Sequence, residues 1–173
     1  MSTSPSPIHK LRLPSAYAAS SFKSPGNEWA YNVPQGTYGS NYADRALVTV
    51  VGYLELTADQ AIYPGRTSQD SPLTLMSNET YTYTFSSKPP VASDGGFWNL
   101  TLYNSEGYLV ANPLNRYSVG DRNNITYPDG NLVYGENDTS GIDGPFQVLV
   151  QPYNVHPPAN WTSNWLPAPV EFY

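Results

Sequence analysis

A dense group of polar side chains lies between residues 112 and 122. Its members are two amides, two guanidinium groups, a phenol and a carboxylate: Asn112, Asn115, Arg116, Tyr117, Asp121 and Arg122. In an enzyme, either arginine would orient a small polar or anionic substrate, Asp121 would act as acid or base, and Tyr117 would donate a proton or a hydrogen bond. The candidate catalytic residues are therefore Arg116, Tyr117, Asp121 and Arg122, and the candidate ligand-binding residues here are Asn112, Asn115 and Arg116.

A structural role explains the same residues. Arg116 or Arg122 would pair with Asp121 and hold a long loop over the fold, and Asn112-Pro113 is typical of the start of a turn. One carboxylate cannot neutralise two arginines. We therefore expect one guanidinium, Arg116 in preference, to remain available to an anion or a polar ligand.

Aromatic rings give a second candidate binding site. The segment "NWTSNWLPAP" is irregular and rich in proline, so we expect Trp161 and Trp165 to be half exposed, where their rings could stack on a sugar. The alternative is that both rings pack inside the fold. Trp98 alternates with Leu100 and Leu102, and this spacing predicts that it belongs to the core.

Several classes of chemistry are disfavoured by what the sequence lacks. There are no cysteines and two histidines, His9 and His156, so we expect no metal site and no cofactor. The motifs of zinc proteases, serine hydrolases and phosphate-binding loops are absent. Eight Lys and Arg residues and a net charge of −6 argue against nucleic-acid binding. No apolar run is long enough to predict a membrane span.

Five N-x-[S/T] sequons favour a secreted or extracellular glycoprotein: Asn78, Asn99, Asn124, Asn137 and Asn160. We expect Asn99 to lie within a strand and the other four to be the usable sites. Residues 1–20 contain no continuous apolar segment, so any signal sequence must lie upstream of this chain. A cytoplasmic location stays open.

The composition predicts an all-β fold. Fifteen tyrosines, 17 prolines and 13 glycines accompany few charged residues, a balance that favours strands and turns. Strict alternation predicts strands in "TYTYTF" (80–85) and "FQVLVQPY" (146–153), and "FWNLTLY" (97–103) starts a hairpin. Pro128-Asp129-Gly130-Asn131 predicts a tight turn. A short helix is expected from Tyr42 to Val51, with Asn41 as its cap.

Several blocks of sequence, in order, resemble the DUF1254/DUF1214 family. They are "YGSNYADRALVTVVGYLELTADQAIYP", "FWNLTLYNSEGYLVANPLNRYSVGDR", "YPDGNLVY" and "NWLPAP". The resemblance implies an antiparallel, jelly-roll-like β-sandwich, often in exported proteins, and implies no established reaction. It predicts a single DUF1214-like domain at 31–173. Residues 1–30 are rich in Ser, Pro and Ala without periodicity, which predicts an extended or disordered lead-in. Family members tend to continue past "NWLPAP" into a final apolar strand, so we expect this domain to lack its last strand and the chain to be a truncated member, a fragment or a reduced paralogue.

Three functions follow from these patterns. The first is a secreted or surface-associated module that binds a small molecule, with carbohydrate as one candidate. The second is an enzyme or enzyme remnant that uses the 112–122 cluster. The third is a structural module that forms homo-oligomers through an exposed sheet edge.

Overall fold

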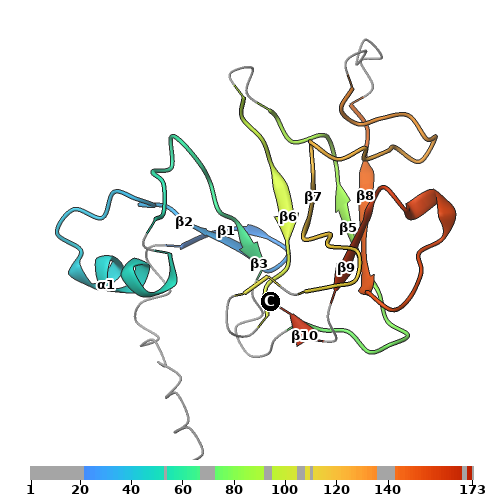
Figure 1. Cartoon of the computed structure of the whole chain (residues 1–173). Helices are drawn as coiled ribbons and strands as arrows, with labels where there is room; N and C mark the ends of the chain where they lie inside the picture. Colours follow the sequence, from blue (N-terminus) through green and yellow to red (C-terminus); the bar gives the residue numbers. More distant parts are fainter. Residues whose placement is uncertain are drawn as a thin grey trace, which may run out of the picture. The chain divides into compact units, whose positions relative to one another are not determined.

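The computed structural model describes residues 22–52, 54–66, 73–91, 95–104, 108–109, 111–135, 143–168 and 171–172. The chain divides into two compact units, Met1–Thr67 and Ser68–Tyr173. The strands are β1 (Phe22–Gly26), β2 (Trp29–Asn32), β3 (Gly65–Arg66), β4 (Leu73–Thr74), β5 (Tyr81–Phe85), β6 (Asn99–Thr101), β7 (Ser118–Gly120), β8 (Phe146–Pro152), β9 (Trp165–Ala168) and β10 (Glu171–Phe172). The helices are α1 (Tyr42–Val51) and the 3-10 turn η2 (Ala159–Trp161) (Figure 1).

The first unit holds an antiparallel sheet in the order β1-β2-β3 and the helix α1. The helix has the predicted bounds, and the predicted cap is confirmed. The side chain of Asn41 accepts a hydrogen bond from the backbone N–H of Asp44 at 3.1 Å. Its amide nitrogen donates to the Asp44 carboxylate at 2.7 Å, so cap and first turn hold each other.

Polar contacts hold this unit together. Among its described residues, the buried side chains are Gln35 and Asp44. The Gln35 amide nitrogen donates to the carbonyls of Leu56 and Ala61, at 2.9 and 2.6 Å, and thereby ties the turn after β2 to the segment after α1. Tyr38, before α1, donates to Glu55, after α1. Burial and then this hydrogen bond raise the pKa of Tyr38.

The second unit is built on a sheet in the order β5-β8-β9 (Figure 1). The predicted strand is confirmed as β8. Phe146, Val148 and Val150 are fully buried in the core, and Leu149 and Gln151 on the opposite face are buried as well. β5 pairs with β8 in antiparallel register, whereas β9 runs parallel to β8 at its other side. Pro167 has no backbone N–H to donate, and it lies in β9, one of the two edge strands of this sheet.

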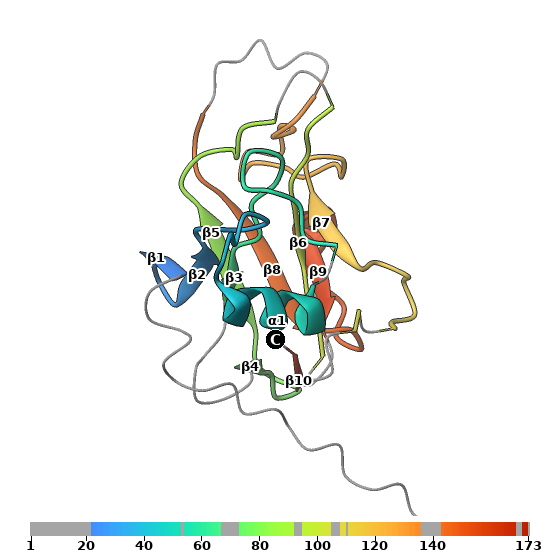
Figure 2. The same cartoon turned by 90° about the vertical axis from the view of Figure 1, so that its left-hand side faces the viewer.

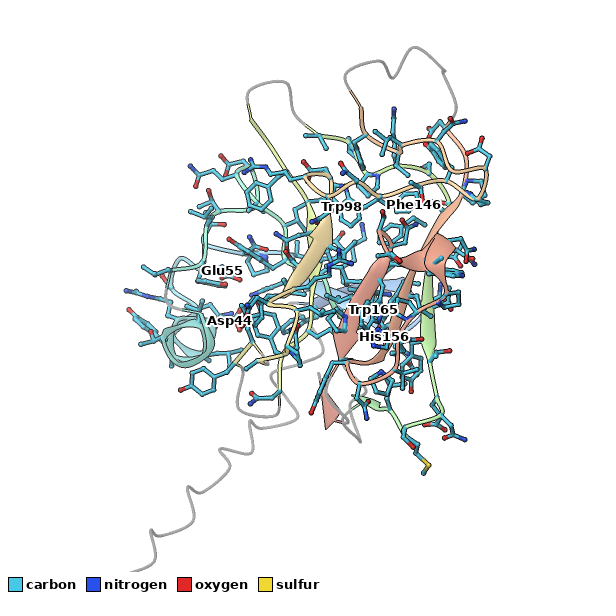
Figure 3. The ribbon with its side chains drawn as sticks, turned by 45° about the vertical axis from the view of Figure 1, so that its right-hand side comes forward. Asp44, Glu55, Trp98, Phe146, His156 and Trp165 are labelled. Carbon is cyan, nitrogen blue, oxygen red and sulfur yellow. The ribbon has the colours of Figure 1, made fainter. Side chains whose placement is uncertain are left out.

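The strands β6 and β7 pair in a second, two-stranded sheet of this unit (Figure 2). Side chains on and beside these strands join the same core. Leu102 is 7% exposed, and Trp98 and Leu100 pack against the core, as their spacing predicted. Trp98 lies with its ring centroid 6.1 Å from that of Phe146 on β8 (Figure 3). An all-β fold with one short α-helix and antiparallel pairing everywhere except between β8 and β9 is thus confirmed for the described residues, while the jelly-roll topology stays a prediction.

The predicted turn at 128–131 forms a short hairpin over this core. The N–H of Gly130 donates to the carbonyl of Tyr127 at 2.9 Å, and Gly130 has a φ of +88°, which glycine adopts without strain. The flanking residues Thr126 and Leu132 pair as an isolated bridge. Residues 126–130 are thereby fixed beside β8, where they form one wall of the groove described below.

Candidate functional site

The first part of the 112–122 cluster closes a turn on itself. The Asn112 side-chain oxygen accepts from the N–H groups of Leu114 and Arg116, both at 3.2 Å, and its amide nitrogen donates to the Arg116 carbonyl at 2.9 Å. Asn115 has a φ of +50°, a left-handed conformation that asparagine tolerates better than most residues. The turn therefore fixes the direction in which Arg116 leaves the backbone.

Arg116 reaches a segment more than 40 residues away in sequence. Its Nη1 donates to the carbonyls of Thr162 and Trp165, at 2.6 and 2.9 Å. Both carbonyls flank the start of β9, so the guanidinium joins the 112–117 turn to the segment that links η2 to β9. Arg116 is half-buried, and the partners shown for its Nη1 are neutral backbone oxygens.

Asp121 is held by the backbone of the neighbouring strand. Its Oδ1 accepts from the N–H of Trp98 at 2.7 Å, and its own N–H donates to the Trp98 carbonyl at 3.3 Å. This close approach depends on Gly120, where an added Cβ would lie 2.1 Å from the Trp98 carbonyl oxygen. The carboxylate therefore extends the β6-β7 pairing by one residue.

The remaining two side chains of the cluster lie at the surface. Arg122 donates through Nη2 to the carbonyl of Gly95 at 3.4 Å, and its guanidinium carbon lies 4.9 Å from the ring centre of Phe97. Tyr117 donates to the Asn115 side chain at 3.4 Å. Among the described residues, the only salt bridge joins Arg66 to Glu28. The predicted ion pair between Asp121 and Arg116 or Arg122 is therefore not formed.

The two tryptophans of the second candidate site differ in exposure. Trp165 is 4% exposed within β9, so its ring is not available at the surface (Figure 3). Trp161, the last residue of η2, is half-buried as expected. The prediction of half-exposed rings is therefore confirmed for Trp161 and wrong for Trp165, because "NWLPAP" forms a strand beside β8 instead of a loop.

Trp161 lines a groove of about 350 Å³. Three segments of the second unit form its walls: the hairpin residues 126, 127, 128 and 130, the β8 residue Gln147, and residues 159–161, 163 and 164 around η2. None of these lining residues is Asp, Glu, Lys, Arg or His. The groove is therefore polar and aromatic without a formal charge.

Asn164 organises the groove. It is 5% exposed, and its amide nitrogen donates to the carbonyls of Thr126 and Gln147, at 2.8 and 2.7 Å. Its oxygen accepts from the Thr126 N–H at 2.8 Å. One buried side chain thus links all three walls, and its hydrogen-bonding capacity is used in doing so.

Other polar groups in the groove have unused capacity. In the part of the chain that the structure describes, the Asn160 amide, the Trp161 indole N–H and the Ser163 hydroxyl have no hydrogen-bond partner. The Gln147 amide nitrogen donates to the Thr84 hydroxyl at 3.1 Å, and within the described residues its side-chain oxygen has no hydrogen-bond partner. These groups supply both donors and acceptors for a bound molecule.

Sequence reasoning identified Trp161 but missed the other walls of the groove. Thr126 and Asn164 are 38 residues apart in sequence, and the hydrogen bonds that join them leave no local pattern. The alternation in "FQVLVQPY" places Gln147 on the face of β8 opposite Phe146, and that alternation is the one local signal that leads toward the groove.

Comparison with known proteins places this chain in a family. The family model described as "Protein of unknown function (DUF1214)" matches residues 60–173. The chain belongs to the DUF1214 family. No curated protein and no solved structure matches it. The matched residues of this DUF1214 protein include the whole groove and the whole 112–122 cluster.

The sequon asparagines are placed as follows. Asn78, Asn99, Asn124 and Asn160 are exposed, and Asn99 lies in β6 as expected. Asn137 lies outside the described residues, as does His9. Among the described residues, no three His, Cys, Asp or Glu side chains gather as metal ligands, and no helix has the length and apolar character of a membrane span.

Proposed function

We propose that this DUF1214 protein binds a neutral, hydroxyl-rich small molecule, with carbohydrate as the leading class, in the groove lined by Trp161. One observation carries the proposal. The groove combines a half-exposed indole ring with unpaired donors and acceptors, and none of its lining residues is charged. Its volume of about 350 Å³ lies within the ~300–1,000 Å³ that small-molecule sites usually have.

These features suit a sugar for physical reasons. The apolar C–H face of a pyranose packs on an aromatic ring, and its hydroxyls exchange hydrogen bonds with amide and hydroxyl side chains. Asn160, Ser163 and Gln147 provide such groups around Trp161. A charged ligand would lose its hydration in this groove without gaining a counter-charge, which disfavours anionic substrates.

The enzyme alternative receives less support. The groove is lined by no carboxylate, histidine, lysine or arginine, and the phenol of Tyr127 is buried, so the groove offers no acid–base pair. In the 112–122 cluster, the Asp121 carboxylate is bound by the Trp98 N–H, and Arg116 is bound to two carbonyls. Both side chains are thus engaged in holding the fold.

We also propose that the protein is exported and acts outside the cytoplasm. Four sequon asparagines have exposed side chains, as N-glycosylation requires. The likeness of the upstream segment to combined DUF1254/DUF1214 proteins adds to this proposal. A homo-oligomer formed through a sheet edge stays a prediction.

The binding proposal is tested with unglycosylated protein made in bacteria. An array of neutral oligosaccharides identifies a candidate, and calorimetry then gives its Kd. We expect Trp161→Ala to weaken binding at least tenfold, which corresponds to ~1.4 kcal/mol or more. Tyr108→Ala is the matched control, because Tyr108 is 67% exposed and lies outside the groove.

Two results would overturn the proposal. The first is the absence of binding to every neutral glycan. The second is binding that Trp161→Ala leaves unchanged. Binding restricted to sulfated or carboxylated glycans, together with loss of it in Arg122→Ala, would instead support a ligand site in the 112–122 cluster.

A further inference from the structure

One residue of the groove belongs to a sequon. Asn160 lines the groove next to Trp161, and Asn160-Trp161-Thr162 fits N-x-[S/T]. Asn160 is exposed, and within the described ranges its side-chain amide has no hydrogen-bond partner. Asn160 is therefore the one sequon asparagine of the described residues that lines the groove.

The local structure keeps Asn160 and Trp161 adjacent. η2 holds both residues in one tight turn, and the Thr162 hydroxyl donates to the Ala159 carbonyl at 3.0 Å. The Thr162 carbonyl accepts from Arg116. A group attached to Asn160 would thus start from a fixed position at the rim of the groove.

We propose that Asn160 is N-glycosylated and that its first sugar lies in the groove against the ring of Trp161. The donor is an oligosaccharide carried on a lipid diphosphate. A bond forms between the Asn160 Nδ2 and the anomeric carbon, the bond from that carbon to the diphosphate oxygen breaks, and the amide gives up one proton. The lipid diphosphate is the leaving group.

The attached sugar matches the groove in chemistry. An N-acetylhexosamine is uncharged, presents an apolar ring face to an indole, and carries hydroxyls and an amide. Those polar groups lie within the range of side chains such as Ser163 and Gln147, which line the same groove. The other exposed sequon residues, Asn78, Asn99 and Asn124, are not among the groove's lining residues.

A regulatory consequence follows, and it rests on the proposed function. A groove of about 350 Å³ lies near the lower end of the range for small-molecule sites, so a sugar attached at Asn160 and packed on Trp161 would compete with a free ligand for the same surface. Glycosylation at Asn160 would close the groove, and the unmodified chain would be the form that binds ligand.

The test measures the solvent accessibility of Trp161 in the groove, and it needs no added ligand. The full chain is secreted from a eukaryotic host behind an added export signal, and mass spectrometry measures the occupancy of Asn160. Hydroxyl-radical footprinting then measures oxidation of Trp161 in the glycosylated protein, in protein trimmed by an endoglycosidase to a single N-acetylglucosamine, and in Asn160→Gln. Asn124→Gln is the matched control, since it removes an exposed sequon away from the groove.

We expect Trp161 to be oxidised at least threefold more slowly in the glycosylated and trimmed forms than in Asn160→Gln, and Asn124→Gln to behave like the glycosylated wild type. An unmodified Asn160 would overturn the proposal. Equal oxidation of Trp161 in all forms would also overturn it. Failure of the unglycosylated protein to bind any neutral glycan would instead count against the proposed function alone, because footprinting does not depend on free ligand.

Discussion

Arg116→Ala is the substitution that separates a structural role for the 112–122 cluster from a ligand-binding role. It deletes the two hydrogen bonds from Nη1 to the carbonyls of Thr162 and Trp165. A hydrogen bond from a charged donor contributes about 1.5–3 kcal/mol when well buried, and Arg116 is half-buried. We therefore expect a loss of ~2–4 kcal/mol in the free energy of unfolding.

Urea unfolding followed by tryptophan fluorescence measures this loss. With a slope of about 2 kcal/mol/M, the midpoint should fall by ~1–2 M. Arg122→Ala is the matched control, because Arg122 is exposed and makes one long hydrogen bond and a ring contact with Phe97. An exposed cation–π contact contributes about 0.5–1 kcal/mol, so the control should lose no more than that.

Sulfate distinguishes the two roles further. This anion stabilises most folded proteins at high concentration, and that general effect should be equal in wild type and Arg116→Ala. A true anion site would add a saturable stabilisation at millimolar sulfate that Arg116→Ala lacks. Near-wild-type stability of Arg116→Ala combined with such a saturable effect would refute the structural reading and restore Arg116 as a ligand-binding residue.

Two further predictions concern the core. Leu102→Ala should cost ~2–5 kcal/mol in the free energy of unfolding, because Leu102 is 7% exposed. Leu109→Ala should cost less than about 1 kcal/mol, because Leu109 is 46% exposed. Equal losses in urea unfolding would contradict the burial of Leu102 in the core. Tyr134 accepts from the Trp98 indole and donates to the Pro89 carbonyl, both at 2.7 Å, and burial raises its pKa from 10.0 to about 12. The native state holds the Tyr134 proton more tightly than the unfolded state does. The contribution of Tyr134 to the stability of the fold is therefore complete below pH 10 and is lost as the pH rises to about 12. Tyr134→Phe should lower stability by ~1–3 kcal/mol at neutral pH and flatten the decline of the melting temperature between pH 10 and 12, and an unchanged decline would contradict this assignment.

Local patterns in the sequence were sufficient to predict individual elements. The alternation of Tyr81, Tyr83 and Phe85 predicts which face of β5 packs against the core, because successive side chains of any strand point to opposite faces. Asn41 followed by Asp44 gave the cap of α1, since both partners lie within one turn. Such features depend on neighbours a few residues apart.

The features that local patterns missed depend on distant pairing. The parallel pairing of β8 and β9 buries Trp165, although the irregular, proline-rich sequence of its segment predicts a half-exposed ring. Arg116 finds its partners 46 and 49 residues away, and they are carbonyls, which every residue carries. No side-chain pattern can therefore indicate which carbonyl an arginine will bind.

The same contacts connect the cluster to the groove. Arg116 holds the carbonyls of Thr162 and Trp165, and between these residues lie Ser163 and Asn164, which line the groove. Removing the guanidinium should thus loosen one wall and weaken ligand binding without any contact between Arg116 and the ligand. The prominent arginine of the sequence would then serve binding by positioning, while Trp161 provides the contact surface.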